Sequence, residues 1–484
     1  MADNDSTPLP TAAEDGRLSF VVCRNSQGVE VRGTLHRLSR YLAVFEVYNP
    51  YSIVQLSEVL RDFRIMMNDR VIYSGRATIA NLVNTGIILI CEASLPDDGW
   101  LDVDIFSPHT QRRRVQTELR EFLAESEKIH QVIADVKVVV ADIQSMLGDL
   151  RRWMEQVEMA VRSMSVDERV DAEREVIVEM EKPILPALWP LFFQFEEAAA
   201  KVPEGLHAVH RNYIKRQLHP MVLCSPFTYR TYQKPLGYAG DYEMVSMMLR
   251  DPYEGSSVFA KVLNRVFLES PTVVAHRNRI DYLTERLTEE TTRVASEGRV
   301  AKVFNLGCGP AQEVQRFIAT HTVSDEADFM LLDFNDETIV HTTRILEEIR
   351  AKHRRRTALT FEKKSVHHVL REYGRPDGHE EAGSYDVVYC AGLFDYLSDR
   401  ICRRLLEIFY DLLAPGGLLI ATNVHTRNPS RQWMESVMDW HLVYRDDGEF
   451  LALAPKQAPS GAMVLRSDPT GVNIFLEVRR PRDD

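Results

Sequence analysis

The chain of 484 residues lacks any uninterrupted apolar run of about 18 residues, the length that a membrane-spanning helix needs. Its first 17 residues are polar and acidic, unlike the charged and then apolar start of an export signal. The 58 Lys and Arg residues are outnumbered by 71 Asp and Glu residues, so the formal net charge is −13. Such a charge disfavours broad binding to nucleic acid or anionic membranes. We expect a soluble cytoplasmic protein with a disordered segment over residues 1–17.

Cysteine is scarce as well, with six residues scattered along the sequence. No Cys-x-x-Cys pair occurs, and no cysteine has the spacing to histidine that zinc sites show. The sequence therefore predicts neither a disulfide framework nor a metal site.

Residues 18–107 contain short runs rich in β-branched and aromatic residues, separated by Gly, Asn, Asp and Pro. Strands are predicted over residues 18–23, 42–47, 70–73, 77–80, 87–91 and 101–105. This pattern is typical of a small β-barrel or sandwich.

The motif Asn81-Leu-Val-Asn-Thr-Gly86 gives this region a resemblance to a PilZ domain, a small barrel that often senses cyclic di-GMP. Asn81 and Gly86 match the family pattern, but Val83 stands where the family has serine, and no Arg-x-x-x-Arg lies just before the first strand. The resemblance implies a degenerate PilZ-like barrel. The departures argue against cyclic di-GMP as a ligand and favour a structural or partner-docking role.

Residues 108–182 change to a helical pattern. Apolar residues between Ile129 and Met164 recur at alternating steps of three and four, which gives a seam of five heptads. A coiled coil through this seam would make the protein a homodimer. A helical hairpin within one chain, packed on the helices that follow, is the alternative.

Residues 183–298 are predicted to form a helical substrate or cap domain. The segment 229–243 within it is dense in Tyr, Gly and charged residues, a mixture that favours a functional loop. A helix predicted over 273–283 then leads towards the next domain. Candidate site residues from this region are Tyr238, Asp241, Tyr242, His276, Arg277 and Arg279.

Residues 299–484 alternate between strand and helix patterns. Strands are predicted over residues 302–306, 329–333, 359–363, 385–390, 417–423, 440–444 and 473–478. The alternation of the first five with helices predicts a mainly parallel sheet covered on both faces. Residues 445–470 look like a loop, so the last two strands are predicted to form an antiparallel hairpin at the sheet edge.

A glycine-rich bend over residues 303–311 follows the first of these strands, and Asp333 ends the second. Glycines let the backbone approach a ligand closely, and a carboxylate at this place accepts hydrogen bonds from ribose hydroxyls. The pair indicates a cofactor that contains adenosine. A dinucleotide would require a third glycine where Gln312 stands.

The bend, Asp333, the run 386–397 and the turn 412–420 together resemble a class I S-adenosylmethionine-dependent methyltransferase over residues 301–480. The resemblance implies an α/β, Rossmann-like fold with a mainly parallel seven-stranded sheet, here behind an N-terminal β-barrel and a helical middle region. Asn305 replaces the usual acid of the first motif, and Ala311 replaces its third glycine.

The resemblance also implies which residues bind S-adenosylmethionine. Gly307 and Gly309 would pass under its amino-acid part, and Asp333 would accept hydrogen bonds from both ribose hydroxyls. The full implied set is Tyr238, Asn305, Gly307, Cys308, Gly309, Asp333, Phe334, Ser365, Val366, Ala391, Gly392 and Leu393. A helix N-cap role is the structural alternative for Asp333 and Ser365, as simple packing is for Cys308.

Methyl transfer is an in-line displacement on an activated sulfonium, so the protein mainly positions the reactants and excludes water. For a carboxylate acceptor, a cationic clamp of Arg277 or Arg279 with His276 would suffice. For a hydroxyl or amine acceptor a base is needed. The catalytic candidates are His276, Arg277, Asp241, Tyr242 and His425.

The runs 234–244, 275–280 and 303–314 are similar to proteins identified as 3-hydroxypalmitic acid methyl ester biosynthesis enzymes, relatives of a quorum-signal synthase of a plant pathogen. The resemblance covers residues 183–481 and implies O-methylation of a 3-hydroxy fatty acid carboxylate. The apolar run 185–193 would then line an acyl site, or it packs in a core. A PilZ-linked regulatory or cofactor-sensing protein with this fold, or a methyltransferase for another small molecule, is the alternative.

Overall fold

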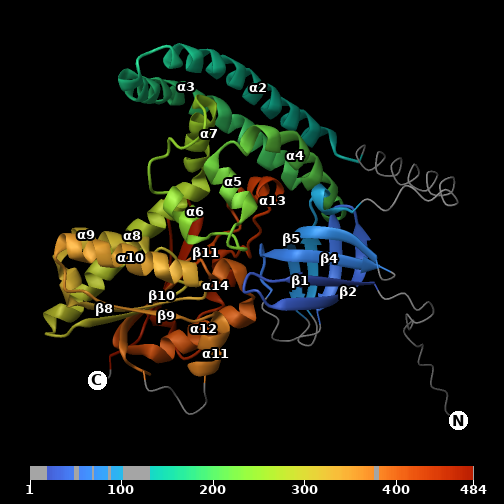
Figure 1. Ribbon diagram of the computed structural model, residues 1–484. Coiled ribbons are helices and arrows are strands. Elements are labelled where there is room, and N and C mark those ends of the chain that lie inside the picture. The colour runs from blue at the N-terminus through green and yellow to red at the C-terminus, as the bar shows by residue number, and fades with distance from the viewer. Residues whose placement is uncertain are drawn as a thin grey trace, which may run out of the picture. The chain divides into compact units, whose positions relative to one another are not determined.

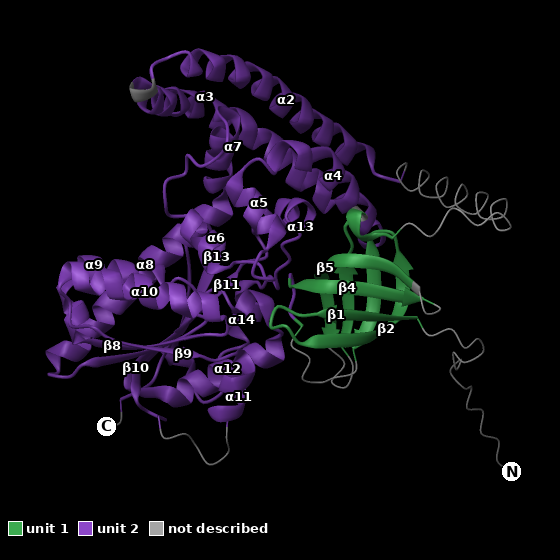
Figure 2. Cartoon of the chain, viewed as in Figure 1, with its two compact units in different colours: residues 1–54, 58–121 green, residues 55–57, 122–484 purple. Residues whose placement is uncertain are grey.

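The computed structural model describes residues 19–47, 54–67, 70–84, 89–101, 131–374 and 381–482. The chain divides into two compact units, coloured separately in Figure 2: residues 1–54 with 58–121, and residues 55–57 with 122–484. The predicted helical region and the predicted sheet region belong to the same unit.

The first unit contains a closed barrel of six strands in the order β1-β2-β3-β6-β5-β4. The strands are β1 Ser19–Arg24, β2 Glu30–Ser39, β3 Leu42–Val47, β4 Val59–Met67, β5 Arg70–Asn84 and β6 Leu89–Ser94. All neighbouring pairs are antiparallel, and β4 closes the barrel on β1. The predicted barrel is confirmed.

Two barrel strands, β2 and β4, were not predicted, because their outward faces carry so many charged residues that the apolar pattern is weak. Asn81 lies in β5 with an exposed side chain, whose Oδ1 accepts a hydrogen bond from the Leu82 N–H at 2.9 Å. Gly86 and most of the predicted strand 101–105 lie outside the described residues. The PilZ resemblance stays a prediction.

The second unit begins with two long helices, α2 Ala134–Arg162 and α3 Val166–Ala200, which run side by side as a hairpin (Figure 1). In the first half of α2 the predicted seam is buried, but in the second half Met154 and Val161 are buried while Trp153 is 51% exposed. A straight helix has 3.6 residues per turn, so a heptad pattern drifts around it by about 20° per heptad. The structure has the intramolecular hairpin, and the homodimer stays a prediction.

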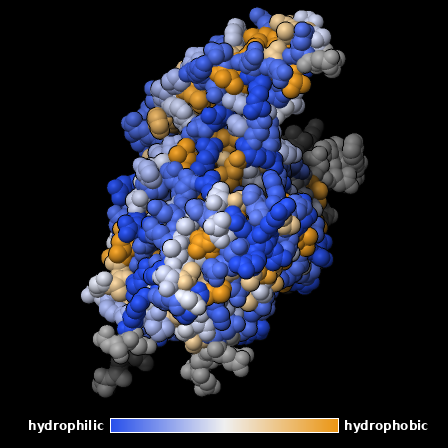
Figure 3. Space-filling view, turned by 90° about the vertical axis from the view of Figure 1, so that its left-hand side faces the viewer, coloured by the Kyte–Doolittle hydropathy of each residue, from blue (hydrophilic) through white to orange (hydrophobic). Residues whose placement is uncertain are grey.

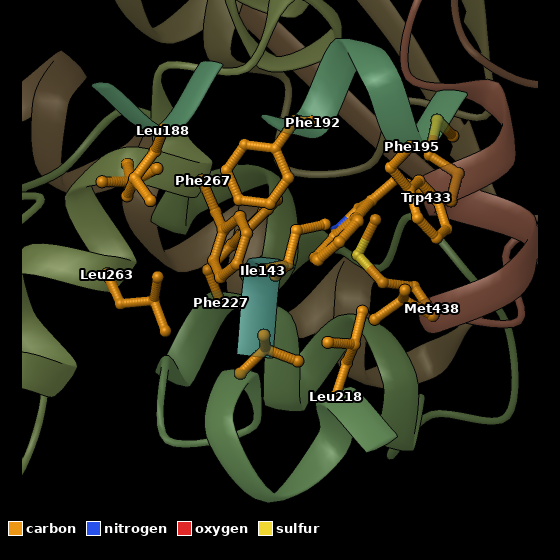
Figure 4. Close-up of a cluster of buried hydrophobic side chains, with 14 of the residues drawn as sticks. Ile143, Leu188, Phe192, Phe195, Leu218, Phe227, Leu263, Phe267, Trp433 and Met438 are labelled. Carbon is orange, nitrogen blue, oxygen red and sulfur yellow. The ribbon is translucent and has the colours of Figure 1, made fainter. Parts of the chain in front are cut away.

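Helix α3 runs through the predicted boundary between residues 182 and 183 and contains three prolines. Each internal proline removes one backbone hydrogen bond. Buried Leu188, Phe192 and Phe195 hold this part of α3 in the core, as Figure 4 shows. We therefore place no domain boundary there.

Five further helices complete the helical region. They are α4 His207–Val222, α5 Pro226–Gln233, α6 Tyr242–Met247, α7 Val258–Leu268 and α8 Pro271–Ser296. Their buried side chains meet Trp433 and Met438, which follow the fifth strand of the sheet (Figure 4). The helices and the sheet region thus share one hydrophobic core.

The sheet has seven strands in the order β12-β13-β11-β10-β7-β8-β9. The strands are β7 Ala301–Leu306, β8 Ala327–Asp333, β9 Ala358–Lys363, β10 Tyr385–Cys390, β11 Leu413–Val424, β12 Met463–Ser467 and β13 Asn473–Arg479. Strands β7 to β11 are parallel, and β13 pairs antiparallel with both β11 and β12. This confirms the predicted α/β fold with a mainly parallel seven-stranded sheet.

The predicted strand over residues 440–444 is wrong. This segment follows α13 (Arg431–Val437) as irregular backbone, and the sixth strand is β12, in the stretch predicted as a loop. Trp440 and Leu442 are apolar because they pack in the helical core, whereas β12 is a short and largely exposed edge strand.

Helices cover both faces of the sheet (Figure 1). Helices α8, α9 (Gln312–Thr320) and α10 (Asp336–His353) lie on one face, and α11 (Val366–Glu372) and α12 (Asp399–Leu412) lie on the other. Adjacent strand residues point to different cores: Val387 packs with the first set and Val388 with the second. This arrangement places the ends of β7, β8 and β10 side by side.

Among the described helices, none combines the length and the hydropathy needed to cross a membrane. On the face drawn in Figure 3, hydrophobic residues form small groups among hydrophilic ones.

Candidate active site

The glycine bend joins β7 to α9 with three left-handed residues. Gly307 has φ +73°, Gly309 has φ +52° and Ala311, at the N-cap of α9, has φ +48°. The backbone N–H groups of Gly307 and Cys308 both donate to the Leu332 carbonyl, at 2.8 and 3.0 Å. Ala311 therefore takes the conformation of the missing third glycine, at a cost of about 1–2 kcal/mol.

Asp333 is tied directly to this bend. Its Oδ2 accepts a hydrogen bond from the Gly309 N–H at 3.1 Å, and its Oδ1 accepts one from the Asn335 N–H at 3.0 Å. Burial raises the pKa of the carboxyl to about 6 although these hydrogen bonds favour the charged form. The N-cap of α10 is Asn335, not Asp333. Each carboxylate oxygen keeps a lone pair for a ribose hydroxyl.

Two aromatic rings lie beside Asp333. The Tyr238 and Phe334 ring centroids are 4.9 Å apart, and the Tyr238 hydroxyl lies 3.3 Å from the Thr338 Oγ1. Burial and the charge of Asp333 raise the pKa of Tyr238. The loop between α5 and α6 thus brings Tyr238 to the place where the resemblance puts the adenine ring.

Ser365 and Val366 have structural contacts of their own. Ser365 is the N-cap of α11 and forms a capping box with His368. Val366 packs against the core beneath α12. The capping role that was the alternative for Ser365 is present, and the binding role of both residues stays a prediction.

The turn after β10 faces the glycine bend. A Cβ at Gly307 would lie 3.4 Å from the Leu393 side chain. The Gly392 N–H donates to the Thr422 Oγ1 at 3.0 Å, and a Cβ at Gly392 would lie 2.9 Å from Arg279 Nη1. Helix α8 therefore places the Arg279 guanidinium over Gly392, next to Ala391 and Leu393.

Arg279 has a hydrogen-bonding neighbour in His276, since its Nη2 lies 3.0 Å from the His276 Nδ1. Burial and the charges of Arg279 and Arg277 hold the pKa of His276 well below its usual range. His276 is therefore neutral at pH 7, and the positive charge belongs to Arg279. In the described part of the chain no carboxylate lies within 4 Å of this guanidinium.

Arg277, predicted as an alternative clamp, lies elsewhere. Its guanidinium donates to the Met248 and Leu268 carbonyls at 2.9 and 2.7 Å and pairs with Glu269 at 3.0 Å. Two residues along a helix differ in direction by about 200°. The structure therefore separates Arg277 from Arg279 and gives Arg277 a structural role.

Three other catalytic candidates have local partners. Asp241 caps α6 and pairs with Arg230 at 2.9 Å. The Tyr242 hydroxyl donates to Glu337 on α10 at 2.7 Å. His425 is buried, and its Nδ1 accepts a hydrogen bond from the backbone N–H two residues later, at 2.9 Å. None of these hydrogen bonds or ion pairs involves Arg279.

Asn305 lies buried beneath the bend, and its Oδ1 has no hydrogen-bond partner in the described ranges. Glu313, which was not predicted, accepts a hydrogen bond from the Tyr389 hydroxyl at 2.7 Å. Burial raises the pKa of Glu313, and the charge of Arg279 opposes this. The sequence did contain a signal for Glu313. It is an acid in the first turn of α9, and it follows a motif in which Asn305 replaces the usual acid.

Cys308 is buried, and burial together with the charge of Asp333 raises the pKa of its thiol. A thiol of this kind is not reactive. Cys308 therefore packs behind the bend.

An apolar pocket lies in the helical region. Its lining residues are Trp189, Phe192, Phe193, Glu196, Phe227, Met248, Phe267, Ser270, Thr272, Val273, Pro429, Ser430, Trp433, Met434, Met438 and Trp440. It holds about 620 Å³ of space, part of which is open to solvent. The Trp433 ring lies 4.9 Å from Phe192 and 5.5 Å from Phe267 (Figure 4).

Helix α8 connects the wall of this pocket to Arg279. Thr272 lines the pocket, and His276 and Arg279 follow it by four and seven residues, so the three lie on one face of the helix. At the other wall, the Trp440 Nε1–H donates to the Tyr396 hydroxyl at 2.9 Å. Tyr396 follows the Gly392 turn by four residues. Arg279 therefore lies about two helical turns beyond the part of α8 that borders the apolar pocket.

Comparison with known proteins agrees with this fold. Residues 304–419 match a family model described as a methyltransferase domain. The search of curated proteins found no match.

Solved structures show weak similarity. A protein described as a possible exported protein from Bordetella parapertussis has 15% identity, covers 66% of this chain and 100% of its own, and has a TM-score of 0.40. Magnesium protoporphyrin IX methyltransferase from Synechocystis with bound SAH has 10% identity, 56% and 99% coverage and a TM-score of 0.33. An N-methyltransferase from Bradyrhizobium japonicum in complex with S-adenosyl-L-homocysteine has 14% identity, 52% and 100% coverage and a TM-score of 0.30.

The family match begins in β7, three residues before Gly307, and includes Asp333 and the turn after β10. Together with the seven-stranded order, it identifies the C-terminal region of this chain as a class I methyltransferase domain, the enzyme class that takes its methyl group from S-adenosylmethionine.

Proposed function

We propose that this chain transfers the methyl group of S-adenosylmethionine to the carboxylate of a long-chain fatty acid, and specifically of a 3-hydroxy acid. The observation that carries the proposal is the position of Arg279, which lies over Gly392 and on the same face of α8 as Thr272, a residue that lines the apolar pocket. The resulting methyl ester would act as a quorum-sensing signal, as the resemblance implies.

The residues around the bend fit the cofactor. Gly307 and Gly309 leave its surface free of side chains, Asp333 offers two carboxylate oxygens, and Tyr238 and Phe334 offer ring faces. When bound, S-adenosylmethionine supplies a methyl group already activated on a positively charged sulfur. The chain then needs to orient the acceptor and exclude water.

Arg279 suits a carboxylate acceptor. Its guanidinium presents a planar fork of donors that matches two carboxylate oxygens. A carboxylate is already deprotonated at neutral pH, so no general base is required. The neutral His276 beside it adds a hydrogen-bonding group without adding charge.

The pocket suits an acyl chain. Its one charged lining residue, Glu196, already accepts hydrogen bonds from the Gln432 and Trp433 N–H groups, both at 2.7 Å. The rest of the wall is mainly aromatic and aliphatic, which favours a long apolar ligand.

The direct test is methyl transfer by the purified full chain. Labelled S-adenosylmethionine is incubated with 3-hydroxyhexadecanoate, hexadecanoate or a short acid, and label in the organic extract is measured. Transfer to the long acids is the expected result. Absence of transfer to every acyl substrate would sink the proposal.

Ser270→Phe is expected to shorten the acceptor range. Ser270 lines the pocket and lies nine residues before Arg279, which is about 13 Å along a helix axis. Its side chain makes no capping hydrogen bond, so a phenyl ring there would fill space at little structural cost. We expect kcat/KM to fall by about tenfold or more for a sixteen-carbon acid and by less than about threefold for a six-carbon acid, since about 1.4 kcal/mol is tenfold. Equal losses for both acids would contradict the position of the chain.

Gly392→Ala is expected to impair transfer by displacing Arg279. The added Cβ would lie 2.9 Å from the guanidinium, and the residue has φ +82°. Gly298→Ala is the matched control, because Gly298 has φ +75° with open space around it. Both variants should lose about 1–2 kcal/mol of stability from backbone strain, measured by denaturant unfolding. Only Gly392→Ala should also lose methyl-transfer activity. Equal activity in the two variants would argue against the contact between residue 392 and the Arg279 guanidinium.

A further inference from the structure

We infer that the Tyr396 hydroxyl selects acyl acceptors that carry a hydroxyl group a few carbons from the carboxylate. Tyr396 is thus a specificity-determining residue of the site. The inference rests on the proposed function, because it names a feature of the substrate bound there.

Tyr396 has neighbours at both parts of the proposed acceptor site, Trp440 in the apolar pocket and Arg279 over Gly392. It ends the 3-10 helix Phe394–Tyr396, directly after the turn that carries Gly392. On the pocket side, its hydroxyl accepts the hydrogen bond from Trp440, which lines the apolar wall. On the other side, the charge of Arg279 is close enough to lower the pKa of Tyr396, although burial and Asp395 raise it overall.

The hydroxyl is also held close to the loop that carries Tyr238. A Cβ built on Gly240 would lie 3.1 Å from the Tyr396 oxygen, and Gly240 has φ +76°. The predicted functional loop therefore approaches the phenol with bare backbone. A side chain at position 240 would crowd the phenol oxygen, so glycine leaves the space beside it open.

One hydrogen-bonding position of this phenol remains for a ligand. The Trp440 N–H donates to its oxygen, so the O–H proton is not used in that bond. No hydrogen bond of the described residues gives this proton an acceptor. Since the raised pKa keeps the phenol protonated at neutral pH, Tyr396 is a donor beside an otherwise apolar wall.

A hydroxyl near the carboxylate of the acceptor would satisfy this donor. With the carboxylate on Arg279 and the chain directed towards Trp440, the first carbons of the chain pass Tyr396. An unsubstituted chain would cover the phenol proton without accepting it. Sites built to hydrogen-bond a substrate oxygen reject analogues that lack it, here by roughly 10- to 100-fold.

The test compares two acids of equal length, 3-hydroxyhexadecanoate and hexadecanoate, as acceptors for the purified full chain. The wild-type ratio of kcat/KM is expected to favour the hydroxy acid by about tenfold or more. In Tyr396→Phe the ratio should fall to about one, mainly through the hydroxy acid. Calorimetric binding of both acids in the presence of S-adenosylhomocysteine should show the same change.

Two further variants separate selectivity from folding. Trp440→Phe keeps an aromatic ring but removes the N–H that orients the phenol, so the ratio should fall part of the way. Tyr444→Phe removes a buried tyrosine hydroxyl beside Asn428, and the ratio should stay at the wild-type value. Cofactor affinity within about twofold of wild type confirms an intact site in each variant, since this is less than 0.5 kcal/mol.

A wild-type ratio near one would overturn the inference and the preference for a 3-hydroxy acid, but it would leave carboxyl methylation of long-chain acids in place. Equal losses for both acids in Tyr396→Phe would overturn the inference alone. Failure of the wild-type chain to methylate either acid would overturn both.

Discussion

Replacing Asp333 with alanine is expected to weaken S-adenosylmethionine binding by about 100-fold or more, measured by titration calorimetry. The carboxylate is held by the Gly309 and Asn335 N–H groups and retains a lone pair on each oxygen. Hydrogen bonds to a charged group contribute about 1.5–3 kcal/mol each, and 2.7 kcal/mol corresponds to 100-fold. The variant also leaves the Gly309 N–H without its partner, which loosens the bend.

The pH dependence gives the same prediction a second readout. Burial raises the pKa of the Asp333 carboxyl in the free protein to about 6, so this group gains a proton as pH falls through 6. Cofactor affinity should therefore be constant above about pH 7 and fall by up to tenfold per unit below 6, because one proton must be released on binding.

Asp336→Ala is the matched control, since Asp336 begins α10 with a side chain that is 73% exposed. Its affinity for the cofactor should stay within about twofold of wild type, as for other surface changes. If Asp333→Ala bound the cofactor as tightly as this control, the assignment of Asp333 would be wrong.

The second large effect is expected for Arg279→Met, which should lower kcat/KM for a long-chain acid by about 100-fold or more. Methionine keeps most of the length of the side chain but removes the donors that would hold the carboxylate. A bidentate pair of charge-assisted hydrogen bonds accounts for a loss of this size. Steady-state kinetics at saturating cofactor measures it.

Cofactor affinity provides the control for Arg279. It should change by less than about threefold in Arg279→Met, because no cofactor contact is assigned to the Arg279 side chain. Arg279→Lys keeps the positive charge but lacks the planar fork of donors. Its activity should therefore lie between that of the wild type and that of Arg279→Met. Full activity of Arg279→Met would remove the observation on which the proposed acceptor depends.

Much of the sheet could be predicted from sequence because its strands are buried on both faces. Strand β10 is buried at every position and is apolar except for Asp386, and Asp333 stands out at the end of the apolar part of β8. The glycine bend could also be predicted from sequence, because it joins two elements, β7 and α9, that are consecutive along the chain. Features formed by neighbours in sequence carry their own signal.

Features formed across long sequence distances could not be predicted. Arg277 and Arg279 look alike in sequence, and only the contacts of α8 with Met248 and Gly392 separate them. Asp241 was a base candidate because its cap and its Arg230 partner are not visible in the sequence. Strand β12 was missed because an exposed edge strand has little apolar pattern.

The apolar pocket shows the same limit. The run 185–193 was recognised as apolar, but its partner Trp433 lies about 240 residues later and comes to it only through the shared core. Core packing and pocket lining use the same residue types, so the sequence left both alternatives open. In the structure, Phe192 does both.

The central claim, carboxyl methylation of a long-chain acid, is tested most directly by the chemical lability of the product. The full chain is incubated with methyl-labelled S-adenosylmethionine and 3-hydroxyhexadecanoate, and the extracted product is treated with alkali. A methyl ester releases the label as volatile methanol, and this release is the predicted result. Label that stays with the fatty chain after alkali would show methylation of the hydroxyl oxygen and would contradict the account.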